Sequence, residues 1–501
     1  MEEKREILTV KQPTILQAQT GVECKLPVEL PPESRILQVT ARAVPLGAES
    51  LSGEAQYAGR VLFCTVYAAA DGTMKKCECG VEFRGKAEDK TLSPHSDLNV
   101  TLFAENVRYR TVGETVYLSA VVSARLTALT PCEYPCYGGA EGVVCKRESL
   151  PFTAAIALVR GETELVDEWD DVAVNDVLLY TAEATVERQE VATQAVIAEG
   201  KTRLFLLLRG ERIFCAEKTF PFRIETEAPS AMPNQQTRLS VCVADVRFDV
   251  VSEPDKNLSH IEVTYALHFT GELYEEKELC VVTDAFSPAA ELICEQSSAP
   301  YYAFAEDQRE SCRTTGRAPI SEIEEGAKML AVVPLSAWGE YTATDGGAEI
   351  EGVISATLFY AANGAIKCTP CDLPITVPLK MGMVEGKEGY SFTAELFLER
   401  LTADFEGGGV SYTAQVSACV KPRSIKQVKF LSRVKVGEEK QQTDCAVRIC
   451  FVREGSDLWT LSKTLGVAPE RVASANPDLT FPLPQDECVL LYNQKVKDYE
   501  G

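Results

Sequence analysis

The chain of 501 residues lacks any apolar run of the roughly 18 residues that a membrane-spanning helix needs. It also lacks the basic start and apolar core of a secretory signal, since its first six residues read MEEKRE. We therefore expect no transmembrane segment and a cytoplasmic protein.

An excess of positive charge is missing as well. The sequence holds 74 acidic and 50 basic residues, a net charge of −24. Such a field repels phosphate backbones, so we expect no nucleic-acid partner.

Histidine is scarce, and the known catalytic patterns are absent. The three histidines are His95, His260 and His268, and no His-Glu-x-x-His, Gly-x-Ser-x-Gly or Walker sequence occurs. Since no nucleophile and base form a recognisable set, we expect no enzyme and no cofactor.

Cysteine, in contrast, is abundant, with 18 residues. In a reducing cytoplasm these side chains stay thiols. Three of them lie in apolar strand patterns, where we expect buried thiols: Cys64, Cys242 and Cys419. An alternative is that accessible thiols crosslink after an oxidising event.

Three short cysteine pairs raise the question of zinc. They are Cys77-x-Cys79, Cys132-x-x-x-Cys136 and Cys368-x-x-Cys371. A closed zinc site needs four ligands, and no segment offers two matched pairs, so we expect no metal.

One order of features occurs three times along the chain. An acidic or proline-rich lead precedes Leu37, Leu178 and Leu330, which are offset by 141 and 152 residues. A hairpin signal follows at Gly72, Gly210 and Gly364, offset by 138 and 154 residues. The agreement of two landmarks indicates three internal repeats.

Each repeat closes with two strands that alternate apolar and polar residues, as in 116–126, 261–269 and 412–420. Period-two alternation buries one sheet face, which predicts antiparallel, β-sandwich-like repeats. We place these repeats at 8–132, 148–288 and 302–422.

Two segments rich in proline, glycine or serine, 130–139 and 297–300, are predicted as short joints between the repeats. Repeats on short joints suggest a rod or a curved string.

A basic segment follows the third repeat. Residues 421–435 hold six cationic residues and no acidic one. We interpret 423–445 as a strand with a solvated face plus a linker, or as a contact for an acidic surface such as a neighbouring domain.

The last part, 446–494, predicts a separate module with a strand, two helices and a strand. Leu458, Leu461 and Leu465 recur at helical spacing before a glycine C-cap at Gly466, and Pro469 suits the first position of a second helix. The expected core side chains are Trp459, Leu461, Leu465 and Val472.

This module resembles a LysM domain in the sequences GSDLWTLS, GV and ANPDL, in this order. The resemblance implies a shallow groove between two loops, which in that family binds N-acetylglucosamine-containing glycans. Its residues here would be Gly455, Ser456, Asp457, Leu458, Asn476, Pro477, Asp478 and Leu479.

The module departs from the LysM pattern at two places. Ser456-Asp457 stands where the family usually has Asp-Thr, and Gln485-Asp486 replaces a Pro-Gly turn. These departures fit a groove that holds a protein, while glycan binding stays an alternative.

The three repeats resemble SPOCS domains, and the whole chain resembles spore morphogenetic proteins that join such repeats to a terminal LysM module. This resemblance implies a scaffold in the mother cell, at the forespore surface, where it supports coat and cortex assembly. Its partner would be the spore coat morphogenetic ATPase that forms the coat basement. The runner-up is an envelope protein that binds peptidoglycan.

Overall fold

A computed structural model describes residues 3–253, 258–320, 323–324, 326–344, 347–379, 390–440 and 447–492. Within these residues the chain forms strands β1–β21 and two short helices, α1 and α2. All strand pairs are antiparallel, and they make several small sheets. The prediction of a mainly β protein is confirmed.

The first repeat consists of two three-stranded sheets. One has the order β1-β6-β5 and the other β2-β3-β4. The bounds are β1 Glu3–Lys25, β2 Arg35–Leu51, β3 Glu54–Ala68, β4 Met74–Glu88, β5 Asp97–Val112 and β6 Thr115–Ala140. Their inner faces enclose one core, in which Phe63 from one sheet and Leu118 from the other are fully buried. Alternation along each strand supplies these inward side chains.

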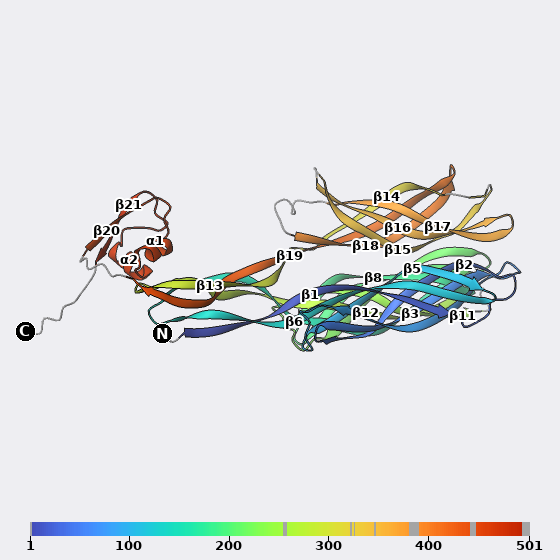
Figure 1. Cartoon of the computed structure of the whole chain (residues 1–501). Helices are drawn as coiled ribbons and strands as arrows, with labels where there is room; N and C mark the ends of the chain where they lie inside the picture. The colour runs from blue at the N-terminus through green and yellow to red at the C-terminus, as the bar shows by residue number, and fades with distance from the viewer. Residues whose placement is uncertain are drawn as a thin grey trace, which may run out of the picture.

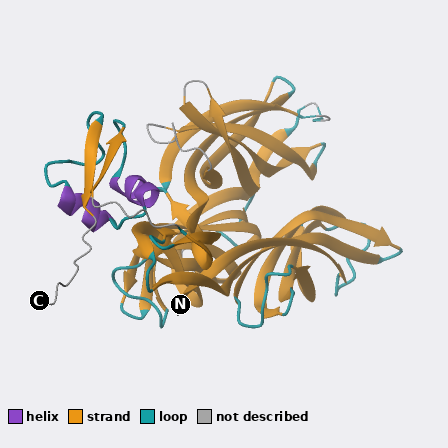
Figure 2. Cartoon of the chain, turned by 60° about the vertical axis from the view of Figure 1, so that its left-hand side comes forward, coloured by secondary structure: helices purple, strands orange, loops and turns teal. Residues whose placement is uncertain are grey.

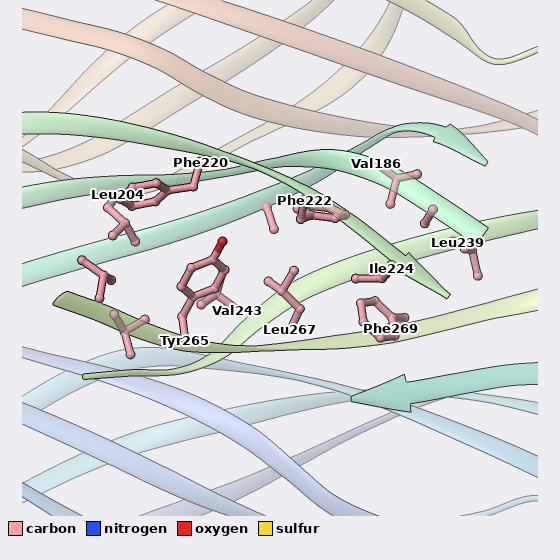
Figure 3. Close-up of a cluster of buried hydrophobic side chains, with 14 of the residues drawn as sticks. Val186, Leu204, Phe220, Phe222, Ile224, Leu239, Val243, Tyr265, Leu267 and Phe269 are labelled. Atoms are coloured by element: carbon pink, nitrogen blue, oxygen red, sulfur yellow. The ribbon is translucent and has the colours of Figure 1, made fainter. Parts of the chain in front are cut away.

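The second repeat has the same plan, with sheets β11-β12-β7 and β10-β9-β8. The bounds are β7 Val144–Val172, β8 Asp176–Ala192, β9 Ala195–Arg209, β10 Ile213–Glu227, β11 Gln236–Glu253 and β12 Leu258–Phe286. Figure 3 shows how Phe220 and Phe222 from one sheet meet Tyr265 and Leu267 from the other.

The third repeat keeps the plan but divides its first strand into β13 and β14. These two strands and β18 pair with β19, and the second sheet has the order β15-β16-β17. The bounds are β13 Ala290–Phe304, β14 Gln308–Pro319, β15 Lys328–Thr344, β16 Gly347–Ala362, β17 Ala365–Leu379, β18 Tyr390–Glu406 and β19 Gly409–Glu439. Leu358 and Val416 lie in its core.

The predicted landmarks coincide with irregular positions in the strands. The pairing register skips one residue at Leu37, at Leu178 and at Leu330, so each is a β-bulge at the same place of its repeat. Asn363 and Gly364 both have positive φ and form a two-residue hairpin turn.

The repeats share a buried core rather than forming a string. The outer faces of the second sheets meet in one cluster, with Val66 from the first repeat, Leu207 from the second and Phe359 from the third, all 0% exposed. The hydroxyl of Thr181 also donates to the carbonyl of Pro334, 2.8 Å away, across two repeats. The expected rod is therefore replaced by three repeats that pack together, because each has a second apolar sheet face.

A stem extends from the packed repeats to the end that carries α1 and α2 (Figure 1). It is built by the distal ends of three strand pairs, β1 with β6, β7 with β12 and β13 with β19. Its core again draws on all three repeats, with Cys136, Val281 and Phe430 buried together.

The two predicted joints lie inside this stem as strands, not as loops. Residues 130–139 belong to β6 and 297–300 to β13. Beyond Leu129, β6 pairs with β1 alone, so Pro131 and Pro135 interrupt no second ladder. The strands of the first repeat consequently run from 3 to 140, past the expected limits of 8 and 132.

The basic segment continues β19 as far as Glu439, and 441–445 lie outside the described residues. Three of its cations pair with acids, and one of these is Lys435 with Glu295 of the same repeat. Lys421 lies 2.7 Å from Glu395 of the same repeat, and Arg423 lies 3.4 Å from the buried Glu272 of the second repeat. The segment thus combines a strand with a contact to a neighbouring repeat.

The three thiols expected to be buried differ in exposure. Cys419 is buried, Cys64 is partly buried and Cys242 is exposed. Because Val243 points into the core of the second repeat, its neighbour Cys242 points outward, which corrects that expectation.

Candidate functional site

The C-terminal module is a unit of its own at the end of the stem, and Figure 2 shows that it carries both helices of the described chain. Its order is β20 (Val447–Val452), α1 (Leu458–Leu465), α2 (Pro469–Ala475) and β21 (Glu487–Tyr492). β20 and β21 form a separate two-stranded sheet. The predicted order of strand, two helices and strand is present.

The helix ends follow from local residues. The Asp457 carboxylate accepts a hydrogen bond from the amide of Thr460 at 2.9 Å, which satisfies a free donor of the first turn of α1. Gly466 has φ 68° and ends α1, and Pro469 begins α2.

The module core consists of Leu461, Val472, Val489 and Leu491, with Leu465 packed against it. Three of the four predicted core residues are therefore inside or at its edge. Trp459 lies outside this core, one position away from the apolar stripe of α1.

The first predicted groove loop is tied to the segment before β21. Gly455 donates its amide to the carbonyl of Leu483 at 2.8 Å, and Leu483 donates to the carbonyl of Ser456 at 3.1 Å. Asp486, at the altered turn, accepts from the amide of Glu454 at 2.8 Å. The backbone of this loop is thus engaged within the module.

Asn476 is a structural link between α2 and β21. Its amide nitrogen donates to the carbonyls of Val472 and Leu490, and its oxygen accepts from the amide of Leu490, each at 2.8 Å. The side chain is buried. Both N–H donors of the Asn476 amide, and one acceptor site of its oxygen, are therefore used inside the module.

The other predicted groove residues divide into inward and outward side chains. Leu458 and Leu479 pack against the module core, while Pro477 and Asp478 are exposed. Of the eight predicted residues, Leu458, Asn476 and Leu479 thus hold the module together, while Pro477 and Asp478 face solvent.

An apolar surface that the sequence reasoning missed lies on the outer face of the β20–β21 sheet. Val447, Ile449 and Phe451 are 50%, 58% and 88% exposed, and Tyr492 opposite Val447 is 53% exposed. The alternation of Val447, Ile449 and Phe451 predicts that these side chains share one face of a strand, but it does not show whether that face is buried or exposed. We call these four residues the outer face.

One side of α1 rests on the end of β12 in the stem. The indole nitrogen of Trp459 donates to Asp284 at 2.8 Å, and the Lys463 ammonium lies 2.7 Å from both carboxylate oxygens of Asp284. The Trp459 ring meets Phe286 edge to face, with centroids 5.2 Å apart. Trp459 therefore anchors the module to the stem, which corrects its expected place in the core.

The charge of Asp284 is favoured by these contacts. Burial opposes ionisation, but hydrogen bonds from Lys463 and Trp459 outweigh it and lower the pKa of Asp284 below 3.8. The carboxylate is thus ionised throughout the neutral range.

Only one of the three stem ends offers this contact. The strand pairs skip one residue at Gly138, Thr283 and Ser432, which makes Gly139 and Arg433 the equivalents of Asp284 in the first and third repeats. Glycine offers no acceptor side chain, and arginine repels Lys463. The module therefore selects the second repeat.

Among the described residues, the one set of three metal-type ligands brought together is Glu168, Asp170 and His260. It includes none of the cysteine pairs considered for zinc. His260 and Asp170 are 2.6 Å apart, and this hydrogen bond raises the pKa of His260. The set lies near the surface as a hydrogen-bonded His–Asp pair beside a second acid, Glu168.

Neither helix of the described chain has the length and apolarity required to cross a bilayer. Comparisons with models of protein families, with curated proteins and with solved structures found no match.

Proposed function

We propose that this chain is a non-enzymatic scaffold of endospore envelope assembly whose C-terminal module holds a protein partner. The observation that carries the protein-binding part is the outer face of the module, where Phe451 is 88% exposed on a sheet with three further exposed apolar residues. The sporulation context rests on the resemblance to SPOCS and LysM proteins. It implies the coat-basement ATPase as the partner, at the forespore surface of the mother cell.

A protein ligand suits the module better than a glycan does. Sugars are recognised largely through hydrogen bonds to their hydroxyls, and two of the polar groove side chains, Asp457 and Asn476, already bond to the module's own backbone. An exposed apolar face instead gains free energy when another protein covers it.

The body of the molecule supports a scaffold. Two cores shared by three repeats fix the repeats relative to one another, and the contact with Asp284 fixes the module on the stem. A rigid body with one module at its end can position a partner at a defined distance from whatever the repeats contact.

The proposal predicts the effect of changing the outer face. Replacing Phe451 by aspartate is expected to weaken recruitment of the ATPase about tenfold, because the most exposed side chain of the outer face, an aromatic one, is exchanged for a charge. The measurement is a binding titration of the full chain with the purified ATPase. Deletion of 447–492 is expected to abolish binding and leave the repeats folded.

Val166→Asp is the matched control, since Val166 is 57% exposed on a strand of the second repeat, far from the module in sequence. Full recruitment by the deletion variant would contradict the proposal. Micromolar binding of chitin oligomers by the full chain, with no binding of the ATPase, would favour the glycan alternative.

A further inference from the structure

The thiols of Cys24 and Cys79 lie in contact inside the first repeat. Their sulfur atoms are 3.7 Å apart, although the residues are separated by more than fifty positions of the chain. Cys24 lies near the end of β1 and Cys79 in β4, so the pair bridges the two facing sheets. Both side chains are partly buried against the core of that repeat.

We infer that Cys24 and Cys79 are an oxidative crosslinking site, which joins the two sheets of the first repeat by a disulfide when the protein meets a peroxide. A disulfide requires its two β-carbons to lie about 3.5–4.5 Å apart, and sulfur atoms already in contact indicate side chains that reach one another. Partial exposure gives a small oxidant access to the pair.

The two thiols have different roles in the reaction. The pKa of Cys24 is raised by burial, but a hydrogen bond from Cys79 counteracts this rise, whereas burial raises the pKa of Cys79 to about 12. Cys24 is therefore the sulfur that ionises first and attacks the oxidant, because the thiolate is the nucleophile.

The chemistry balances with hydrogen peroxide as the oxidant. The Cys24 thiolate attacks one peroxide oxygen and the O–O bond breaks. The second peroxide oxygen departs as hydroxide, and Cys24 becomes a sulfenic acid. The sulfur of Cys79 then attacks the sulfur of Cys24, the S–O bond breaks, and hydroxide leaves and takes the Cys79 proton as water. Two thiols lose two protons and two electrons, and one peroxide becomes two waters.

The other repeats provide internal comparisons. The bulges at Leu37, Leu178 and Leu330 align the three repeats. The cross-strand pair Phe63–Cys79 of the first repeat then corresponds to Leu204–Lys218 in the second and to Ala356–Cys371 in the third. The residues at the place of Cys24 are Asp167 and Gly316. The third repeat thus has a cysteine, Cys371, at the position of Cys79, but a glycine at the position of Cys24. The first repeat alone has a thiol at both positions.

The test is oxidation of the full chain with hydrogen peroxide, followed by trypsin digestion without reduction and mass spectrometry. Cys77 and Cys79 lie in one tryptic segment, between Lys76 and Arg84, so the experiment uses a Cys77→Ser background. We expect a linked product of the segments that contain Cys24 and Cys79. We also expect the melting temperature to rise by about 2–4 °C and to return on reduction.

Cys24→Ser and Cys79→Ser are each expected to abolish the product, and Cys371→Ser to leave it unchanged. Circular dichroism of the reduced variants checks that they fold. A Cys24 that links to another cysteine, or a Cys24 that reaches sulfinic acid while Cys79 stays a thiol, would overturn the assignment.

Discussion

Replacing Phe359 by alanine is expected to lower the free energy of unfolding by about 3–5 kcal/mol. The side chain is 0% exposed and packs in the cluster where three repeats meet. Its removal deletes a large buried surface and leaves a cavity lined by residues of different repeats, among them Leu207 and Val66. The measurement is urea unfolding followed by circular dichroism.

The position of Phe359 further predicts which strands lose protection. Hydrogen exchange of the variant should increase in β3 and β9 as well as in β16, because all three contribute to the shared cluster. Phe222→Ala is the matched control, since Phe222 is buried in the core of the second repeat alone. Faster exchange confined to the third repeat in the Phe359 variant would show that the repeats are not coupled there.

Asp284→Arg is expected to release the module from the stem. The change removes the acceptor of Trp459 and sets a cation against Lys463, so the ratio of docked to free module should fall about thirtyfold, a change of about 2 kcal/mol. Because the ion pair is partly exposed to solvent, the larger share of the loss comes from the indole hydrogen bond and the repulsion. Hydrogen exchange of α1 and of the end of β12 reports the release.

A second substitution tests the charge logic of this contact. Lys463→Asp on the Asp284→Arg background should restore docking in part, because the ion pair is re-formed with its signs exchanged. Glu141→Arg, at the end of the first repeat, is the control and should leave α1 protected. Equal protection of α1 in the wild type and in Asp284→Arg would contradict the role of Asp284.

Docking should also depend on pH in one direction. The pKa of Asp284 is lowered from 3.8 in the docked form, so the contribution of its charge is present above pH 3.8 and is lost as the pH falls through the lower pKa. Protection of α1 is thus expected to stay constant from pH 8 to about 4 and to decrease only below that.

The repeats and the local structure can be predicted from the sequence, because they depend on residues that are neighbours in the chain. Leu37, Leu178 and Leu330 were aligned from their surroundings and turn out to be equivalent bulges. The start of α1 at Leu458 and its end at Gly466 follow from a capping carboxylate and a residue that adopts positive φ.

The packing of the repeats could not be predicted in the same way. Alternation shows which face of a strand is apolar, but it does not show what covers that face. The shared cluster around Phe359 and the stem core around Phe430 are formed by residues hundreds of positions apart. The prolines of 130–139 predict a break in the chain, but this part of β6 is paired on one side only, and such a strand tolerates proline.

The candidate site was predicted in part for a related reason. Asp457 and Asn476 belong to a motif that predicts a ligand groove. The buried amide of Asn476 instead makes three hydrogen bonds to backbone groups and holds the module together. Trp459 was placed by helical spacing, which cannot reveal a partner surface such as Phe286. Phe451 followed an alternation that fits either face of a strand.

The unequal stem ends have a consequence for stoichiometry. Three separate identical subunits would end in three identical tips, and a tail that fits one would fit all. Covalent linkage of the repeats lets Gly139, Asp284 and Arg433 differ at one equivalent position while the shared cores are kept. Each molecule consequently holds its C-terminal module in a single orientation, so an assembly built from it would contain one bound partner per chain.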